Sequence, residues 1–261
     1  MTAGTQQTFG LSGMQALRVA LFVGLLLVAW QLLSDHFRMP VYLLPSPLAI
    51  GKSLVADYPI YAKHALATLT EIVIGFTTGV TTGVLLAIAM SRSQTIANAL
   101  HVPILATQAM PTIAIAPILI IWFGVGLAPK VIVITIFSFF PVLVNTLAGL
   151  QATGDQMVKL MRSVAATEWQ IYRYIRIPMA LPHFFSGVRL AAAASVIGAV
   201  VVEWVSSDRG LGYLLILHES RLNTDKAFAT LVILICLSIS IFALTAAAER
   251  RLSWTKRLGL S

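Results

Sequence analysis

Long runs of apolar residues, separated by short polar stretches, dominate the sequence. A helix needs about 20 mostly apolar residues to cross the hydrocarbon core of a membrane. Runs near that length cover residues 16–33, 64–90, 97–123, 130–150, 183–205 and 227–248. They are continuous, without the alternation of barrel strands, and backbone groups in lipid need internal partners. The pattern predicts an all-α integral membrane protein with about six transmembrane helices.

Polar and proline positions divide the chain further. The first run is expected to remain as a helix rather than be cleaved as a signal peptide, because no small-residue cleavage site follows it. In the polar stretch 34–63, Pro47 is expected to start a short amphipathic helix over 48–55. The third run contains Pro103, Pro111 and Pro117. The predicted organisation is an N-terminal helix and external segment over 1–62, a membrane core over 63–249 and a basic tail over 250–261.

Composition agrees with a membrane location. Hydrophobic residues make up 58% of the 261 residues and charged residues 11%, against about 25% charged in soluble domains. The single cysteine, Cys236, excludes an intrachain disulfide and a thiol metal cluster, so no metal site is expected.

The basic residues predict the orientation. The net charge is +8, and Lys and Arg gather in residues 151–182 and in the tail, with Arg18 and Arg92 on the same side of the membrane. Because cytoplasmic loops carry an excess of Lys and Arg, both termini and residues 151–182 are predicted to be cytoplasmic. Basic residues clustered with aromatics on a soluble face would indicate nucleic-acid binding, and the distribution along the chain argues against it.

Residues 151–182 are longer than a simple connection needs and are patterned. Apolar residues recur at helical spacing at Leu160, Met161, Val164, Ala165 and Trp169. Thr167 is a good cap for a second helix, and Pro178 and Pro182 are expected to stop it before the next span. The pattern favours two interpretations equally: a helical ligand for a groove in a soluble partner, or a helix on the membrane surface.

This segment resembles the EAA loop of ABC-importer permeases, which starts with Glu-Ala-Ala, contains a Gly and ends with Ile-x-Leu-Pro. The matching residues are Arg162-Ser163-Val164-Ala165-Ala166-Thr167-Glu168-Trp169-Gln170-Ile171, Ile175-Arg176-Ile177-Pro178 and Leu181-Pro182. Lys159 stands where Glu is common, and Ala165 replaces the Gly, so that a turn needing positive φ would be strained there. The resemblance implies that the residues from Arg162 to Trp169 couple to an ATPase, with Pro178 ending the element.

Other motifs agree with the nitrate, sulfonate and taurine branch of these permeases. They are Leu44-Pro45-Ser46-Pro47, Ile121-Trp122-Phe123-Gly124, Phe140-Pro141 and Gly210-Leu211-Gly212-Tyr213. The stretch from Ile197 to Glu203-Trp204 looks most similar to permeases for pyrimidine thiamin precursors or riboflavin.

The resemblance implies a type I permease fold in the cell membrane of a prokaryote, with a second permease chain, a homodimer being expected. It also implies two cytoplasmic ATPase subunits and an external substrate-binding protein. ATP and Mg would be bound by the ATPase, so that this chain holds no cofactor and is no enzyme. The residues agree: Gly51-Lys52-Ser53 lacks the first glycine of a phosphate-binding loop, because Ser46 occupies that position.

Several further residues are candidates. Gly75, Gly79 and Gly83 recur on one helix face and predict close helix packing. A carboxylate in lipid needs a partner, and Lys63 or His64 is nearby for Glu71. Four polar or aromatic residues are candidates for the substrate path, with structural or interfacial roles as the alternative: Gln108, Asn145, Glu203 and Trp204.

The predicted function is the permease of an ATP-driven importer for a small organic solute. The solute is expected to be a pyrimidine, riboflavin-like or other aromatic compound, with sulfonate, taurine or nitrate as the alternative. A channel or secondary transporter without an ATPase is the alternative from another class, for which pathway charges or broken helices at mid-membrane would be expected; the sequence has few such charges. A membrane enzyme would need clustered catalytic residues.

Overall fold

A computed structural model describes residues 13–37, 40 and 42–252, and each regular element in that part of the chain is a helix. The elements are α1 (Gly13–His36), α2 (Pro47–Ala56), α3 (Tyr58–Arg92), α4 (Gln94–Ala109), α5 (Thr112–Phe123), α6 (Leu127–Gln151), α7 (Asp155–Ser163), α8 (Glu168–Ile171), the π-helix η1 (Tyr172–Arg176), α9 (Ile177–Ser206), α10 (Leu211–Ser220) and α11 (Thr224–Leu252). The all-α fold is confirmed. Lys256 and Arg257 of the predicted tail, like residues 1–12, lie outside the described residues.

Five spans have the length and composition to cross a membrane, and a sixth is bent. The five lie in α1, α3, α6, the continuous helix from α8 to α9, and α11, whereas α4 and α5 meet at 104°. The run over 97–123, expected to be interrupted by prolines, is therefore two helices. Met110 has extended backbone before Pro111, as residues before proline prefer. Pro103 and Pro117 lie inside helices.

The short external helix forms as expected. The Ser46 hydroxyl accepts the Ala49 N–H at 3.3 Å, and Pro47 occupies the first turn of α2. Because α3 starts directly afterwards at Tyr58, it is longer than the apolar run beginning at residue 64. Its 35 residues correspond to about 52 Å at 1.5 Å per residue.

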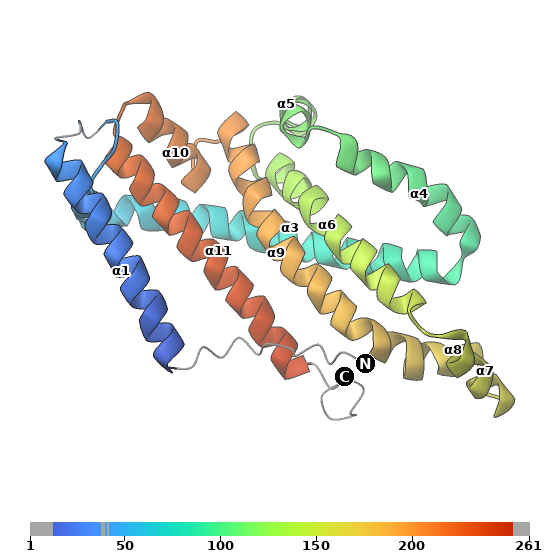
Figure 1. Ribbon diagram of the computed structural model, residues 1–261. Helices are drawn as coiled ribbons and strands as arrows, with labels where there is room; N and C mark the ends of the chain where they lie inside the picture. Colours follow the sequence, from blue (N-terminus) through green and yellow to red (C-terminus); the bar gives the residue numbers. More distant parts are fainter. Residues whose placement is uncertain (1–12, 38–39, 41, 253–261) are drawn as a thin grey trace.

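Three long helices, α3, α6 and α9, form the centre of the bundle, with α3 crossing the other two steeply (Figure 1). Glycines allow the close contacts. A Cβ atom at Gly75, Gly79 or Gly83 would lie 2.5–2.6 Å from atoms of α6. Gly149 and Gly187 have the same role between α6 and α9, where a Cβ would lie 2.8 and 2.7 Å from the neighbouring helix.

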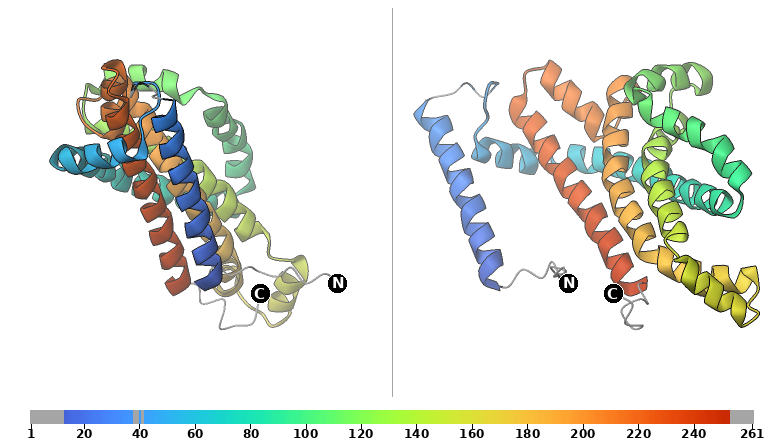
Figure 2. Two further views of the ribbon diagram at one scale, coloured as in Figure 1. Left: turned by 60° about the vertical axis from the view of Figure 1, so that its left-hand side comes forward. Right: turned by 45° about the vertical axis from the view of Figure 1, so that its right-hand side comes forward.

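The remaining helices lie around this centre. α10 and α11 pack beside α9, and α2 packs against α11. Figure 2 shows α1 apart from the other helices; Trp30 approaches Phe228 of α11, with ring centroids 5.9 Å apart. Most apolar side chains of α1 are exposed, as expected for a helix surrounded by lipid.

The two ends of the bundle differ. The α7–α8 unit, residues 155–171, projects at one end, where α1 begins and α11 ends (Figure 1). α5, α10 and the connection from α9 to α10 lie at the opposite end. The start of α1, the end of α11 and the α7–α8 unit are thus on one side, as the basic residues predict.

Candidate functional site

The α7–α8 unit is built around a tight turn. The Ala166 N–H donates to the Met161 carbonyl and the Ala165 N–H to the Arg162 carbonyl, both at 3.0 Å. This is the hydrogen-bond pattern of a Schellman motif, whose extra residue is left-handed and usually Gly. Here Ala165 has φ +57°, so the strain expected from Ala at this place is present.

A capping box begins α8. The Thr167 hydroxyl accepts the Gln170 N–H at 3.3 Å, and Gln170 Oε1 accepts the Thr167 N–H at 2.8 Å. Thr167 is therefore the cap that the sequence predicts. The Arg162 guanidinium reaches across the turn to Glu168 Oε1, with Nη2 at 2.8 Å, but both side chains are more than half exposed. This ion pair defines the shape of the turn and adds little to stability.

The base of the unit is fixed to the end of α3. Tyr172 is buried, and its hydroxyl lies 3.2 Å from the Ser91 hydroxyl. The guanidinium of Arg92 lies over the Tyr172 ring at 4.6 Å and approaches the Trp169 ring at 5.6 Å. Such cation–π contacts stabilise by about 0.5–1 kcal/mol at exposed sites, so they join α8 to the end of α3.

The outer part of the unit carries exposed apolar side chains. Leu160 is 60% exposed, Val164 69% and Trp169 55%. They belong to α7, the turn and α8, and the residues around them are basic or small, with Arg162 and Lys159 also exposed. An apolar tip on a short helical hairpin outside the bundle is a surface that a protein groove can bind.

The predicted stop at Pro178 and Pro182 is wrong. The helix runs on from Glu168 to Val205, and Pro182 lies inside it. The π-helix η1 explains how Pro178 is accommodated: the Ile177 N–H donates to the Tyr172 carbonyl, five residues back, and Pro178 then occupies the first turn of α9. A proline in a first turn gives up an N–H that needs no helical partner.

The four predicted path residues do not come together in one pocket. Gln108 and Trp204 are exposed on α4 and α9, and the Asn145 amide donates to the Pro141 carbonyl at 2.8 Å. A cavity of about 360 Å³ between α4 and α6 is lined by His101, Phe140, Gln151 and apolar neighbours, without any of the four. Glu203, at 1% exposure, faces neither this cavity nor the surface.

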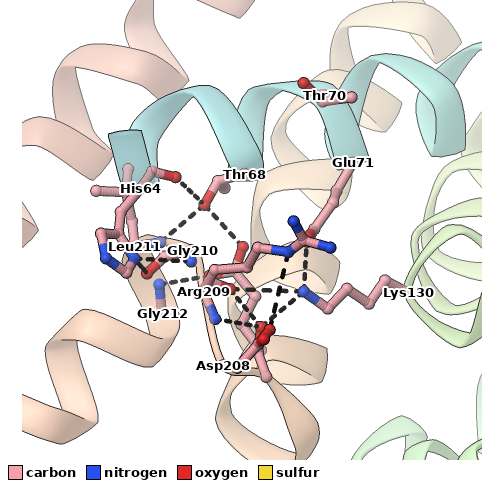
Figure 3. A network of polar contacts seen from close by, with 12 residues as sticks. His64, Thr68, Thr70, Glu71, Lys130, Asp208, Arg209, Gly210, Leu211 and Gly212 are labelled. Atoms are coloured by element: carbon pink, nitrogen blue, oxygen red, sulfur yellow. Dashed lines mark hydrogen bonds and ion pairs between the residues drawn. The ribbon is translucent and has the colours of Figure 1, made fainter. Parts of the chain in front are cut away.

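A buried network of polar groups lies at the end of the bundle opposite the α7–α8 unit (Figure 3). Glu71 pairs with Lys130 of α6 at 2.6 Å, and both side chains are at most 5% exposed. The Lys130 ammonium also donates to the Ser207 hydroxyl at 2.6 Å. The expected pairing of Glu71 with Lys63 or His64 is therefore wrong, because Lys130 is brought to it by the packing of α6 on α3.

Glu203 joins the same network from α9. One of its oxygens lies 2.7 Å from the Thr68 hydroxyl, and the other accepts the Gly212 N–H at 2.5 Å. The Leu211 N–H also donates to Thr68, at 2.8 Å. These bonds join the first turn of α10 to α3 and α9. The interfacial position considered for Glu203 is wrong, since α10 covers it.

Two members of this network were missed in the sequence. Lys130 is a cation at the start of an apolar run, next to a polar turn. A lysine there is ordinarily expected to lie among the lipid headgroups. Thr68 is one of several threonines of α3. A buried carboxylate needs a partner, but nothing in the local sequence identifies one on another helix.

Comparison with known proteins agrees with the geometry. The family model described as "Binding-protein-dependent transport system inner membrane component" matches residues 79–254. The formylaminopyrimidine transport permease protein ThiX of Halalkalibacterium halodurans is 35% identical, over 93% of this chain and 98% of its own length. The riboflavin transport system permease protein RibX of Chloroflexus aurantiacus is 34% identical, over 91% of this chain and 89% of its own.

A solved structure has the same fold. The chain from a crystal structure of an amino acid ABC transporter with histidines is 20% identical and superposes with a TM-score of 0.63. The match covers 77% of this chain and 97% of that chain.

Proposed function

The chain belongs to the family of inner membrane components of binding-protein-dependent transport systems, and we propose that an ATPase drives it through the α7–α8 unit. It is a multi-pass membrane protein and the permease of an ABC importer for small solutes, working with an ATPase and a binding protein. The proposal depends above all on the exposed apolar tip at Leu160 and Val164, which stands outside the bundle. The expected type I permease fold accords with the structural neighbour.

In the proposed coupling, the tip of the unit sits in a groove of the ATPase. Force applied there reaches the spans through η1 and α9, which continue from α8 without a break. Tyr172 and Arg92 transmit it to α3 as well, through the ring contacts at the base of the unit. A rigid unit that binds a moving ATPase would transmit force to the spans. An isolated helix on the lipid surface would do so less well. The pairing of Arg162 with Glu168 also removes one cation from contact with anionic lipid.

The assembly proposed for this chain is symmetric. Two copies form the solute path as a homodimer, two ATPase subunits bind the two α7–α8 units, and a binding protein delivers the solute from outside. The termini and the unit then face the cytoplasm of a prokaryotic cell. This chain hydrolyses nothing itself; ATP and Mg are held by the ATPase.

The proposed solute is a flat heteroaromatic compound of the pyrimidine or flavin class. This follows the two relatives named above, one a formylaminopyrimidine and the other a riboflavin permease. Taurine, a sulfonate or nitrate is the alternative. Binding of these compounds to the partner binding protein, followed by uptake into proteoliposomes holding the full transporter, would identify the solute.

The coupling proposal is tested by placing a charge at the tip. Val164→Glu changes a side chain that is 69% exposed, so it leaves the fold intact. Val55→Glu is the matched control, since Val55 is 81% exposed on α2 at the other end of the molecule. We expect Val164→Glu to lower both ATPase co-purification and ATP-driven uptake by about 10-fold or more, as burying a charge in an apolar interface does.

Retention of the ATPase and of uptake by Val164→Glu would contradict the coupling role. Uptake that continues without ATP or the ATPase would instead favour the channel or secondary transporter.

A further inference from the structure

Buried carboxyl groups meet where α3, α6 and α9 reach the end of the bundle opposite the α7–α8 unit (Figure 3). We propose that Glu203 holds a proton there, and that the neutral acid fastens the first turn of α10 to α3. The observations behind this proposal are independent of the proposed coupling through the α7–α8 unit.

The charges near Glu203 do not balance unless a proton is present. Glu71, Lys130 and Glu203 are 3%, 4% and 1% exposed. Lys130 lies 2.6 Å from Glu71 and neutralises it. The hydrogen-bond partners of Glu203 among the described residues are neutral: the Thr68 hydroxyl and the Gly212 N–H. An ionised Glu203 would be a buried charge without a counterion, which is strongly disfavoured.

The other ionisable groups around the network do not supply the missing positive charge. His64 of α3 turns its Nδ1 to the Gly210 backbone, 3.0 Å from the nitrogen and 3.2 Å from the carbonyl oxygen, and it has no printed contact with Glu203. Arg209 is 66% exposed and its guanidinium lies 3.8 Å from Asp208 in the connection before α10. His218, farther along α10, faces the ring of Tyr61.

The hydrogen bonds of Thr68 are compatible with a protonated Glu203. Its hydroxyl lies 3.3 Å from the His64 carbonyl, which only accepts, and 2.8 Å from the Leu211 N–H, which only donates. A hydroxyl has one hydrogen to donate and two lone pairs. If it donates to His64, its second lone pair is open to a donor, and Glu203 Oε1 at 2.7 Å is that donor when protonated. The other oxygen, Oε2, accepts the Gly212 N–H.

A second buried carboxyl oxygen supports this assignment. Glu71 Oε2 has no hydrogen-bond partner among the described residues, although it is buried. Two ionised carboxylates in one buried network that holds a single ammonium would repel. Protonation of Glu203, whose partners are neutral, removes the repulsion and leaves the Glu71–Lys130 pair intact.

The neutral acid also explains the Gly210-Leu211-Gly212 motif. Gly210 has φ +118°, and a Cβ added to it would lie 2.2 Å from the Glu203 carboxyl carbon. The backbone therefore passes directly over the carboxyl group and places two successive N–H groups, of Leu211 and Gly212, on Thr68 and Glu203. The connection between α9 and α10 is held to α3 by these bonds.

The test compares two substitutions of acid by amide in the full-length permease, purified in detergent. Glu203→Gln mimics the protonated acid, because the amide donates to Thr68 and accepts from Gly212. We expect its apparent melting temperature to stay within about 2 °C of the parent. Glu71→Gln removes the counterion of Lys130 and is expected to lower it by roughly 10 °C. Glu219→Gln, an exposed change on α10, is the control.

Infrared spectroscopy gives a readout that does not depend on stability. At neutral pH the parent minus Glu203→Gln difference spectrum should contain the carbonyl stretch of a protonated carboxylic acid, shifted in heavy water. The Glu219→Gln difference spectrum should lack it. Absence of the band from the Glu203→Gln difference would overturn the proposal. So would a pattern in which Glu71→Gln is harmless and Glu203→Gln destabilises, since the proton would then be on Glu71.

Discussion

Ala165→Gly should stabilise the α7–α8 unit. Ala165 has φ +57° in the Schellman turn, a conformation that costs an L-residue with a Cβ about 1–2 kcal/mol. Glycine avoids that cost but loses about 0.5–1 kcal/mol of chain entropy on folding. The expected net gain is about 1 kcal/mol, which corresponds to about a 5-fold lower population of the opened turn. Hydrogen exchange measured by mass spectrometry on peptides covering residues 155–171 should slow by that factor.

The neighbouring change Ala166→Gly is the matched control. Ala166 is not among the described residues with positive φ, so glycine there brings only the entropic loss and should speed exchange. Equal effects of the two substitutions, or faster exchange in Ala165→Gly, would refute the assignment of strain to Ala165. If the strain serves coupling, Ala165→Gly will also alter ATP-driven uptake while ATPase binding is kept.

Three further substitutions test packing and charge. Gly79→Ala puts a Cβ 2.6 Å from a side-chain atom of α6 and should destabilise the bundle by about 1–3 kcal/mol in a thermal melt. Gly24→Ala on α1 is the control, because its Cβ meets nothing within 4 Å, and it should be harmless. Lys130→Met leaves Glu71 buried and unpaired and should cost about 3–5 kcal/mol. Changing Glu71 to Met in the same chain should recover most of that loss; no recovery would mean that the pair is not the cause. Arg92→Ala removes the cation from the two rings at the base of α8 and should lower ATP-driven uptake more than ATPase binding; unchanged uptake would exclude this contact from force transmission.

Local sequence was sufficient for much of the fold. The apolar runs predicted the spans because hydropathy over about 20 residues decides whether a helix is stable in lipid. Ser46 with Pro47 marked the start of α2, and Thr167 marked the start of α8, because capping depends on residues within one turn. The strained position at Ala165 was identified through the resemblance to the EAA loop, in which a Gly stands there.

Tertiary structure decided where distant parts meet. Three prolines lie in the third run, and the helix ends before Pro111, whereas Pro103 and Pro117 lie inside α4 and α5. Pro178 did not end its helix, because the π-helix η1 before it changes the hydrogen bonding from four to five residues back.

The partner of Glu71 shows the same division. The sequence predicted that a carboxylate in an apolar helix needs a counterion, but the nearby candidates, Lys63 and His64, were wrong. Lys130 is 59 positions away and reaches Glu71 because glycines let α6 approach α3 closely. The residue types by themselves determined that this chain is a membrane protein and that it carries a helical segment between two of its spans. Which buried charges meet, and therefore where a proton is needed, depended on contacts between helices that no local pattern specifies.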